Sequence, residues 1–593
     1  YFGQLSNFQL ADEESPARAE FLDPVGDPVA SAFRPWEAME AHVDDAMIRQ
    51  LNLFSAPGAA PVPDGSGDRP AMDFSINTGD SADSQQLNET LWVRTLIDGG
   101  SFDPNSGVDK TGYSHPLCDP VAADVPGASE AALYTGVQDY DDYDETQVNP
   151  IGSPGTPYFY DPDDPTGHAA GWPAYPGLMD RAQGDFDTPG LAPSAPSYLA
   201  FGNHDGLVQG SIGGIATIES VATGCIKPMT ASFPSGRSIF SPDATVQDIL
   251  DLHAATPQKT MLVPPDPARR YVSKEQYKDI FRASPQADGH GFDYVDPAEE
   301  AASNHNAGYY SFTPKPGLRM IALDTISEGG VFDASSGNID DPQYRWLEGE
   351  LQEATAAREL VVLFSHHAPP SLTSNQADEA SGACVGPDEH GHDASISCDI
   401  DPRDSTPIHL QAGMVELLHR YDNVIAWVAG HSHVNRVQAF PDGEGHGFWA
   451  IRVAAEADWP QQARLLQLFD NHDGTLSLFG TIVDHTADAT APPPGNATVF
   501  GVGKLASVAR TLAYNDPQNG ARACAPTPCG EGAAQDRNVE LLIADPRPAL
   551  EPEPATPPQK AKKKKCKRKQ AKGKGPRSAA AKRKCKKRAG KHK

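Results

Sequence analysis

The sequence predicts an α/β protein, and two observations carry this prediction. Short apolar stretches typical of strands alternate with stretches of helical spacing, in the repeated order strand, loop, helix. Four of the apolar stretches end in a cluster of Asp, Asn or His. Because ligands bind beyond the carboxyl ends of the strands in open α/β sheets, we expect these distant clusters to meet at one sheet edge.

In the first part of the chain, apolar periodicity predicts helices and short apolar runs predict strands. Trp36, Met39, Val43 and Met47 recur every three or four positions, which is the spacing of one helix face. The expected strands are 1–10, 72–77 and 197–201, and the expected helices are 34–54 and 87–97.

The later part of the chain repeats the same pattern. The expected strands are 318–323, 360–364, 424–429, 447–454, 463–469, 475–483 and 538–543, and the expected helices are 342–358 and 412–421. The strands 447–454, 463–469 and 475–483 have the character of antiparallel strands, with an Asn-His-Asp-Gly turn at 471–474.

The chain is expected to form one large domain over residues 1–545, interrupted by long loop insertions. The first insertion is rich in Asp, Pro, Gly and Tyr and has no sustained period. A Pro-rich linker, 546–559, and a disordered basic tail, 560–593, are expected to follow. The insertions are placed at about 99–197, 206–305 and 371–406.

Charge divides the chain into an acidic body and a basic tail. The tail, 560–593, carries 19 of the 48 Lys and Arg residues and no acid, which leaves 29 basic against 80 acidic residues before it. An acidic body argues against nucleic-acid binding by that body, because phosphate repels carboxylate. The tail is expected either to attract an anionic cell surface, such as cell-wall polymer or lipid headgroups, or to act as a solubilising segment that pairs with the acidic body; nucleic acid is the less favoured partner of the tail.

Cysteine placement favours a secreted or cell-surface protein. Cys384 with Cys398 and Cys524 with Cys529 are close pairs in loop-like sequence, so loop disulfides are expected, with free surface thiols as the alternative. No apolar stretch approaches the ~18 residues of a membrane span. The sequence has the pattern of a strand from its first residue, so we expect an N-terminal truncation or a removed export signal.

Two of the polar clusters contain Asp and Asn. Gly79-Asp80 follows an expected strand, and its carboxylate is suited to bridge two cations, although Gly-Asp is also a common turn. Gly202-Asn203-His204-Asp205 is more specific. Asn203 offers a neutral oxygen to a metal, and His204 is placed to donate a proton or hydrogen bond to a phosphoryl oxygen.

The other two clusters contain His. His366 and His367 are adjacent at a strand end, and we expect at most one of them, His366, to bind a metal. Gly430-His431-Ser432-His433 places two imidazoles at i and i+2 on an extended loop, from which they can reach two neighbouring metals.

In this order the motifs resemble those of the calcineurin-like metallophosphoesterase superfamily, which includes purple acid phosphatases and cyclic-nucleotide phosphodiesterases. The series of that superfamily is D-x-H, G-D-x-x-D, G-N-H-D/E, a lone His, and G-H-x-H. The last four are present here, and the resemblance covers roughly residues 1–485. It implies a four-layer αββα sandwich of two mixed sheets, with two metal ions of the Fe, Mn or Zn type.

The resemblance also implies roles for individual residues. His204 would be the catalytic His and Asp205 would orient it, while Asp83 would support the site without binding metal. Asp80 would bridge the metals. The remaining implied ligands are Asn203, His366 and His431 for the second metal and His433 for the first.

The first motif departs from the series. Asn7 and Gln9 stand where Asp and His are expected, and neutral amide oxygens are weaker metal ligands than carboxylate or imidazole. We expect the first site to be weak, or to be completed by Asp12 or Glu13.

The resemblance implies a metal-dependent hydrolase of phosphate esters on a small-molecule or polymer substrate. A hydroxide activated by a dinuclear metal site would attack phosphorus. The alternative is a catalytically weakened relative that binds phosphorylated ligands or anionic cell-surface polymer without turnover. The sequence does not choose between monoester and diester.

Overall fold

The computed structural model describes most of the expected domain. The described residues are 1–20, 31–107, 160, 162–163, 172–214, 216–228, 260–327, 335–375, 401–516, 518, 520–524 and 529–547. The expected Cys384–Cys398 disulfide, the basic tail, and large parts of the three insertions lie outside them. The proposed domain boundaries therefore stay predictions.

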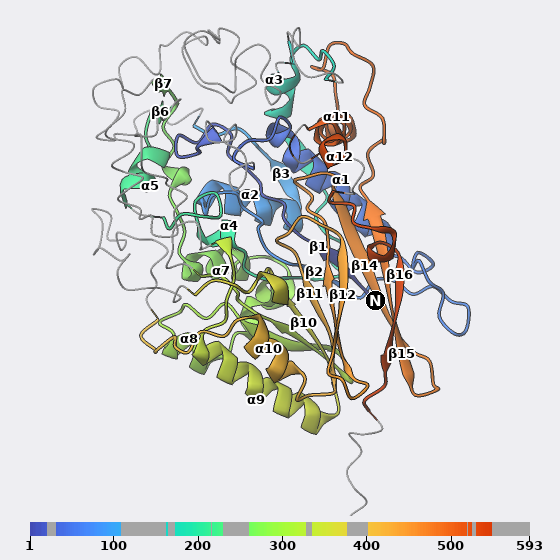
Figure 1. Ribbon diagram of the computed structural model, residues 1–593. Coiled ribbons are helices and arrows are strands. Elements are labelled where there is room, and N and C mark those ends of the chain that lie inside the picture. The colour runs from blue at the N-terminus through green and yellow to red at the C-terminus, as the bar shows by residue number, and fades with distance from the viewer. Residues whose placement is uncertain are drawn as a thin grey trace, which may run out of the picture. The chain divides into compact units, whose positions relative to one another are not determined.

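Two mixed six-stranded sheets form the centre of the fold (Figure 1). In the first sheet, β1, β2 and β5 are parallel, while β14, β15 and β16 continue it in antiparallel pairings. Its order is β16 (Val539–Ala544), β15 (Thr475–Asp484), β14 (Gln462–Asp470), β1 (Phe2–Leu5), β2 (Phe74–Asn77) and β5 (Ser197–Leu199).

The second sheet has a parallel centre with an antiparallel strand at each edge. The parallel strands are β9, β10, β11 and β13, and β8 and β12 flank them. Its order is β12 (Arg436–Pro441), β13 (Gly447–Arg452), β11 (Val424–Ala429), β10 (Leu360–Ser365), β9 (Leu318–Ala322) and β8 (Tyr310–Lys315).

Side-chain alternation along the strands produces the layers. In β10, Val362 and Phe364 pack into a core shared with the first sheet, whereas Val361 and Leu363 face a second core. That second core contains apolar side chains of α9 (Asp341–Ala357) and α10 (Gln411–Leu418).

Helices on the other side complete the four layers. A third core joins α1 (Glu40–Phe54) to α11 (Val502–Asn515), and other side chains of α1 and α2 (Leu87–Asp98) enter the core between the sheets. The predicted α/β class, with two mixed sheets between helical layers, is therefore confirmed.

Shorter elements surround this centre. They are β3 (Gly100–Phe102), β4 (Phe186–Thr188), β6 (Ile226–Pro228), β7 (Thr260–Leu262), α3 (Leu178–Ala182), α4 (Asn203–Gly206), α5 (Ala216–Ala222), α7 (Lys274–Arg282), α8 (Pro297–Ala302) and α12 (Ala521–Cys524). Cys524 and Cys529 form the disulfide expected for that pair. Among the described helices, none combines the length and apolar character needed to cross a membrane.

The strand pairing differs from the prediction at one place. Residues 447–454 were expected to continue the antiparallel strands 463–469 and 475–483, but β13 lies in the other sheet, parallel to β11. Its antiparallel partner is β12, which the sequence did not predict. Five of the six residues of β12 are exposed or half-buried, so this edge strand lacks the apolar run of a central strand.

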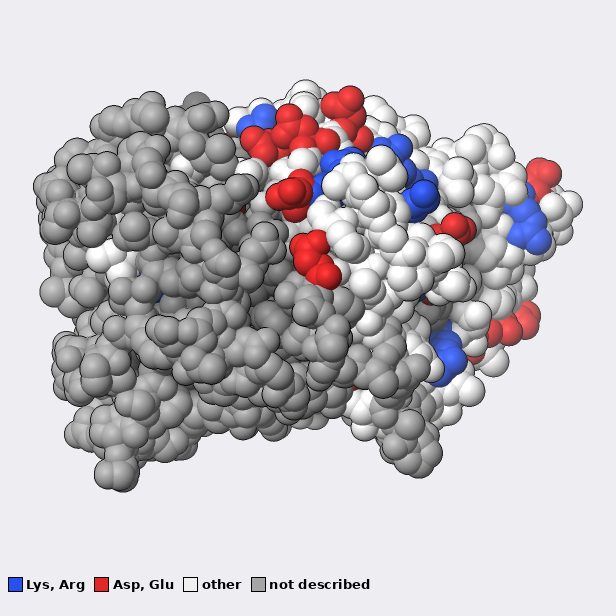
Figure 2. All heavy atoms as spheres, turned by 90° about the horizontal axis from the view of Figure 1, so that it is seen from above, with Lys and Arg blue, Asp and Glu red and all other residues white. Residues whose placement is uncertain are grey.

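Charges mix on the surface. On the face shown in Figure 2, acidic and basic side chains of the described residues lie interspersed. The described part of that face therefore presents no large field of one sign.

Candidate metal centre

Five strands of the two sheets bring the predicted residues to one region, in or next to a single pocket. Asn7 follows β1, Asp80 follows β2, and Asn203 follows β5, all in the first sheet. His366 and His431 follow the neighbouring strands β10 and β11 of the second sheet. The carboxyl ends of parallel strands from both sheets thus meet, as the motif spacing predicted.

The backbone at this meeting point is held in the left-handed region. The φ angles are +57° at Asn7, +46° at Gln9, +56° at Asp80, +66° at His431 and +52° at His433. A non-glycine residue in this region costs of order 1–3 kcal/mol and persists where its surroundings hold it. These five positions therefore mark a strained, well-supported site.

Asp80, His366 and His431 bring oxygen and nitrogen donor atoms close to one another. His366 Nδ1–H donates to the Thr78 carbonyl at 2.8 Å, which leaves the Nε2 lone pair 3.0 Å from Asp80 Oδ2. His431 Nδ1 lies 3.3 Å from the same His366 Nε2. Lone pairs this close repel one another unless a cation or a proton lies among them.

Asn203 completes this set. Its Nδ2 donates to the Gly210 carbonyl at 2.9 Å, which fixes the amide orientation. Its Oδ1 is buried and has no hydrogen-bond partner among the described residues. Asn203 lines the same pocket as Asp80 and His431, and an orphaned buried oxygen there fits a metal that takes mixed O and N ligands.

Electrostatics keep these groups in the metal-binding forms. Burial would raise the pKa of Asp80, but His366 and His204 hold it well below its usual value. Burial, with His367 and His366 nearby, lowers the pKa of His431 well below its ordinary value. The carboxylate is therefore ionised and the imidazole neutral, as metal ligands must be.

His367 belongs to the same histidine cluster but serves a structural role. Ring nitrogens of His366, His367 and His431 lie within 4.8 Å of one another. However, Nδ1 of His367 contacts Thr325 Oγ1 at 2.9 Å and its Nε2 contacts the Ser335 carbonyl at 2.9 Å. With both nitrogens engaged, His367 has no lone pair left for a cation.

His204 lies at the pocket wall with a fixed ring. Its backbone N–H donates to Asp80 Oδ1 at 2.8 Å, and its Nδ1–H donates to the Asp83 carbonyl at 2.8 Å. Burial lowers the pKa of His204, but Asp80 and Asp83 outweigh it and raise that pKa to about 9. These carboxylates favour the protonated ring, and with Nδ1 engaged that ring can donate through Nε2.

Asp205 does not orient His204, contrary to the expectation. Its carboxylate accepts four backbone N–H groups, from Gly202, Asp80, Ser81 and Ala82, at 2.9–3.0 Å. Asp205 therefore ties the loop after β2 to the loop after β5. The backbone carbonyl of Asp83, which lies further along the first of these loops, holds the imidazole instead.

The expected completion by Asp12 or Glu13 is also wrong. Asp12 Oδ2 accepts from Arg269 Nε at 2.8 Å and from Asn88 Nδ2 at 2.7 Å, in a separate buried network. Glu13 Oε1 accepts from Gln183 Nε2 at 3.0 Å. The chain turns away after Gln9, which places both carboxylates outside the pocket lining.

Sequence reasoning missed two residues beside the pocket. Asp458 Oδ2 accepts the Nδ1–H of His433 at 2.5 Å, and Arg34 Nε donates to Asp458 Oδ1 at 2.7 Å. Burial would raise the pKa of Asp458, but Arg34 and His433 hold it well below its usual value. Neither residue belongs to a motif, so no spacing signal marks them.

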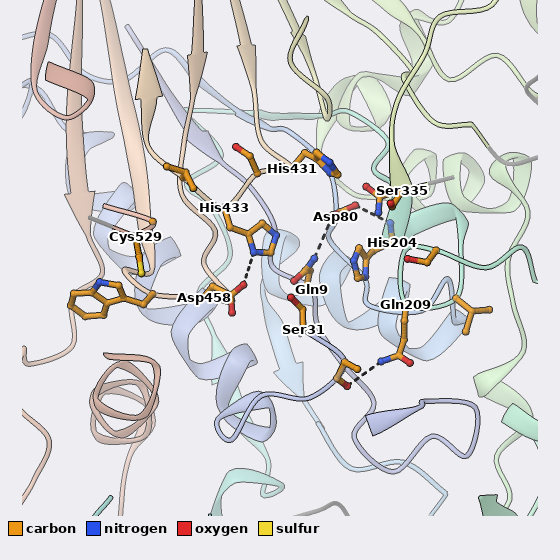
Figure 3. A pocket seen from close by; sticks show the side chains of 18 of the residues that line it. Gln9, Ser31, Asp80, His204, Gln209, Ser335, His431, His433, Asp458 and Cys529 are labelled. Carbon is orange, nitrogen blue, oxygen red and sulfur yellow. Dashed lines mark hydrogen bonds and ion pairs between the residues drawn. The ribbon is translucent and has the colours of Figure 1, made fainter. Parts of the chain in front are cut away.

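The pocket itself has a volume of about 520 Å³. Figure 3 shows Asp80, His204, His431 and His433 around it, with Asp458 joined to His433 by a hydrogen bond. Its outer wall includes Trp459 and the Cys524–Cys529 disulfide, and the described lining residues include neither Lys nor Arg.

Comparison with known proteins gave structural similarities only. No protein-family profile and no curated protein matches the sequence. Among solved structures, a dimetal phosphatase from Danio rerio is similar with a TM-score of 0.33 at 11% identity, covering 82% of this chain and 98% of that one. A structure of PhoD is similar with a TM-score of 0.24 at 10% identity, covering 86% of this chain and 76% of that one. The function proposed below rests on the side chains already described.

Proposed function

We propose that this protein is a metal-dependent hydrolase of phosphate esters. The observation that carries the proposal is the convergence of Asp80, Asn203, His366 and His431 beside His204. The donor set contains oxygen and nitrogen without thiolate, which suits Fe, Mn or Zn. When bound there, such a cation supplies Lewis-acid polarisation of a phosphoryl group and lowers the pKa of water.

The chain's own residues would supply the remaining chemistry. His204 lines the pocket and would donate its Nε2 proton to the leaving oxygen of the ester as the P–O bond breaks. The backbone carbonyl of Asp83 would hold the imidazole in position through Nδ1, and the nearby Asp83 carboxylate would favour its protonated form. Asp205 would hold Asp80 and the loop after β5 in fixed positions relative to each other.

The test combines metal content with hydrolysis of p-nitrophenyl phosphate and bis-p-nitrophenyl phosphate. His204→Gln should lower turnover by roughly 10²–10⁴-fold while metal content is unchanged. His472→Gln is the matched control, because that side chain is 86% exposed on the β14–β15 turn. Full turnover in His204→Gln would remove His204 from the mechanism.

A second candidate is a protein that binds phosphorylated ligands without turnover. The amides of Asn7 and Gln9, which replace the expected Asp and His, favour it. Calorimetric binding of inorganic phosphate by the metal-loaded protein, with no release of p-nitrophenol from either ester, would support this candidate over the hydrolase.

A further inference from the structure

Two side-chain amides occupy the place that the first metal of a dinuclear centre would take. Asn7 Nδ2 lies 3.3 Å from Asp80 Oδ2 and 2.9 Å from His433 Nε2. Gln9 Nε2 lies 3.5 Å from the same Asp80 oxygen. The atoms that a first cation would join are thus already joined by NH₂ groups.

The orientation of the Asn7 amide is fixed by a partner that can only donate. The backbone N–H of His431 points to Asn7 Oδ1 at 3.2 Å. A flipped amide would set its NH₂ group against this N–H, so the oxygen must face His431. The NH₂ group, which has no lone pair to offer a metal, therefore faces Asp80 and His433.

The same reasoning fixes Gln9. Arg34 Nη2 donates to Gln9 Oε1 at 2.7 Å, and a guanidinium has no acceptor. Arg34 is itself held by Asp458 through Nε at 2.7 Å and Nη2 at 3.3 Å. The Gln9 oxygen is committed to Arg34, and its NH₂ group faces the carboxylate of Asp80.

His433 is engaged at both ring nitrogens. Asp458 Oδ2 takes the Nδ1–H, so Nε2 carries the lone pair, and that lone pair accepts from Asn7 Nδ2. The implied ligand of the first metal therefore has its donor atom already satisfied. Asn7, Gln9 and His433 do not fit a cation at this place.

We propose that the centre of this protein holds one cation, and that the amide groups of Asn7 and Gln9 replace the other. This inference rests on the proposed function for its metal site and specifies the stoichiometry of that site. The single cation belongs to Asp80, Asn203, His366 and His431. The hydrogen bonds of the amides partly neutralise the Asp80 oxygen that would otherwise bridge two metals.

The test measures how many metal ions the full chain binds. The metal-depleted protein is titrated with Zn²⁺ by calorimetry, and the bound metal is counted by plasma mass spectrometry after desalting. We expect one equivalent for the wild type, one for His433→Ala, and none for His366→Ala. Circular dichroism checks that each variant is folded.

A double substitution tests the cause. Asn7→Asp with Gln9→His returns a carboxylate and an imidazole to the first site, and two equivalents are expected. Asn7→Asp alone should raise the number of bound Zn²⁺ equivalents above one, but by less than the double substitution does. If the double variant fails to fold, the wild-type count and His433→Ala still decide the question.

The outcomes separate this inference from the proposed function. Two equivalents in the wild type, with a loss of one in His433→Ala, overturn the inference and leave the hydrolase standing. One equivalent without hydrolysis of either aryl phosphate supports the inference and overturns the hydrolase. No bound metal overturns both.

Discussion

Replacing Asp205 with Asn should weaken both the fold and the metal site. The two carboxylate oxygens accept two N–H groups each, at 2.9 Å from Asp80 and Gly202 and at 2.9–3.0 Å from Ser81 and Ala82. An Asn side chain offers one oxygen, and its NH₂ group would face two N–H donors. Two hydrogen bonds to a charged acceptor are lost, at about 1.5–3 kcal/mol each.

The free energy of unfolding of Asp205→Asn should therefore fall by about 3–6 kcal/mol. Urea unfolding of the metal-free protein, followed by tryptophan fluorescence, measures this change. Because Asp80 loses its backbone anchor, Zn²⁺ affinity measured by calorimetry should also fall, by roughly 10–100-fold. Asp422→Asn, at an exposed position, is the matched control. The reasoning fails if both variants match the wild type in unfolding midpoint and Zn²⁺ affinity.

Three other predictions concern stability and selectivity. Burial lowers the pKa of His42 to about 3 from an ordinary 6.5, so the unfolded chain binds the proton first and stability falls as pH drops below 6.5. The free energy of unfolding falls by about 2 kcal/mol at pH 5 for this reason. In His42→Phe this loss should be absent, so the urea midpoint should change less between pH 7 and pH 5 than it does in the wild type. An unchanged pH dependence in the variant would contradict this. Asp12→Ala leaves Arg269 buried without its closest carboxylate, so stability should drop by about 3–5 kcal/mol in thermal unfolding while the Zn²⁺ count is unchanged. A fall in that count would make Asp12 a ligand after all. Besides the one cation proposed above and His204, the described pocket lining offers neither Lys nor Arg to a second phosphate charge, so we expect kcat/KM to be higher for the monoanionic bis-p-nitrophenyl ester than for the dianionic monoester; the reverse order would refute this.

Strands, and the polar residues that follow them, were predictable because they leave local signals. The strand 424–429 was predicted with the bounds that β11 has, since all six residues are apolar and buried. Asp80 and His431 were predicted because they follow such runs directly. In these cases the information lies within a few consecutive residues.

Contacts across the fold were not predictable in the same way. The pair of Arg34 with Asp458 joins residues far apart in the sequence, and no local pattern links them. The roles of Asp83 and Asp205 were exchanged, because adjacency to His204 suggested a contact that the backbone does not make. The orientation of the Asn7 side-chain amide depends on the backbone N–H of His431, which follows a strand of the other sheet.

The position of β1 has a consequence for biosynthesis. β1 lies between β2 and β14 in the first sheet, with Phe2 opposite both Phe74 and Leu466. A chain emerging from the ribosome cannot fill the middle of this sheet until several hundred further residues have been made. Under the proposed function, nascent chains that lack β14 should therefore bind no metal, and metal loading should follow translation.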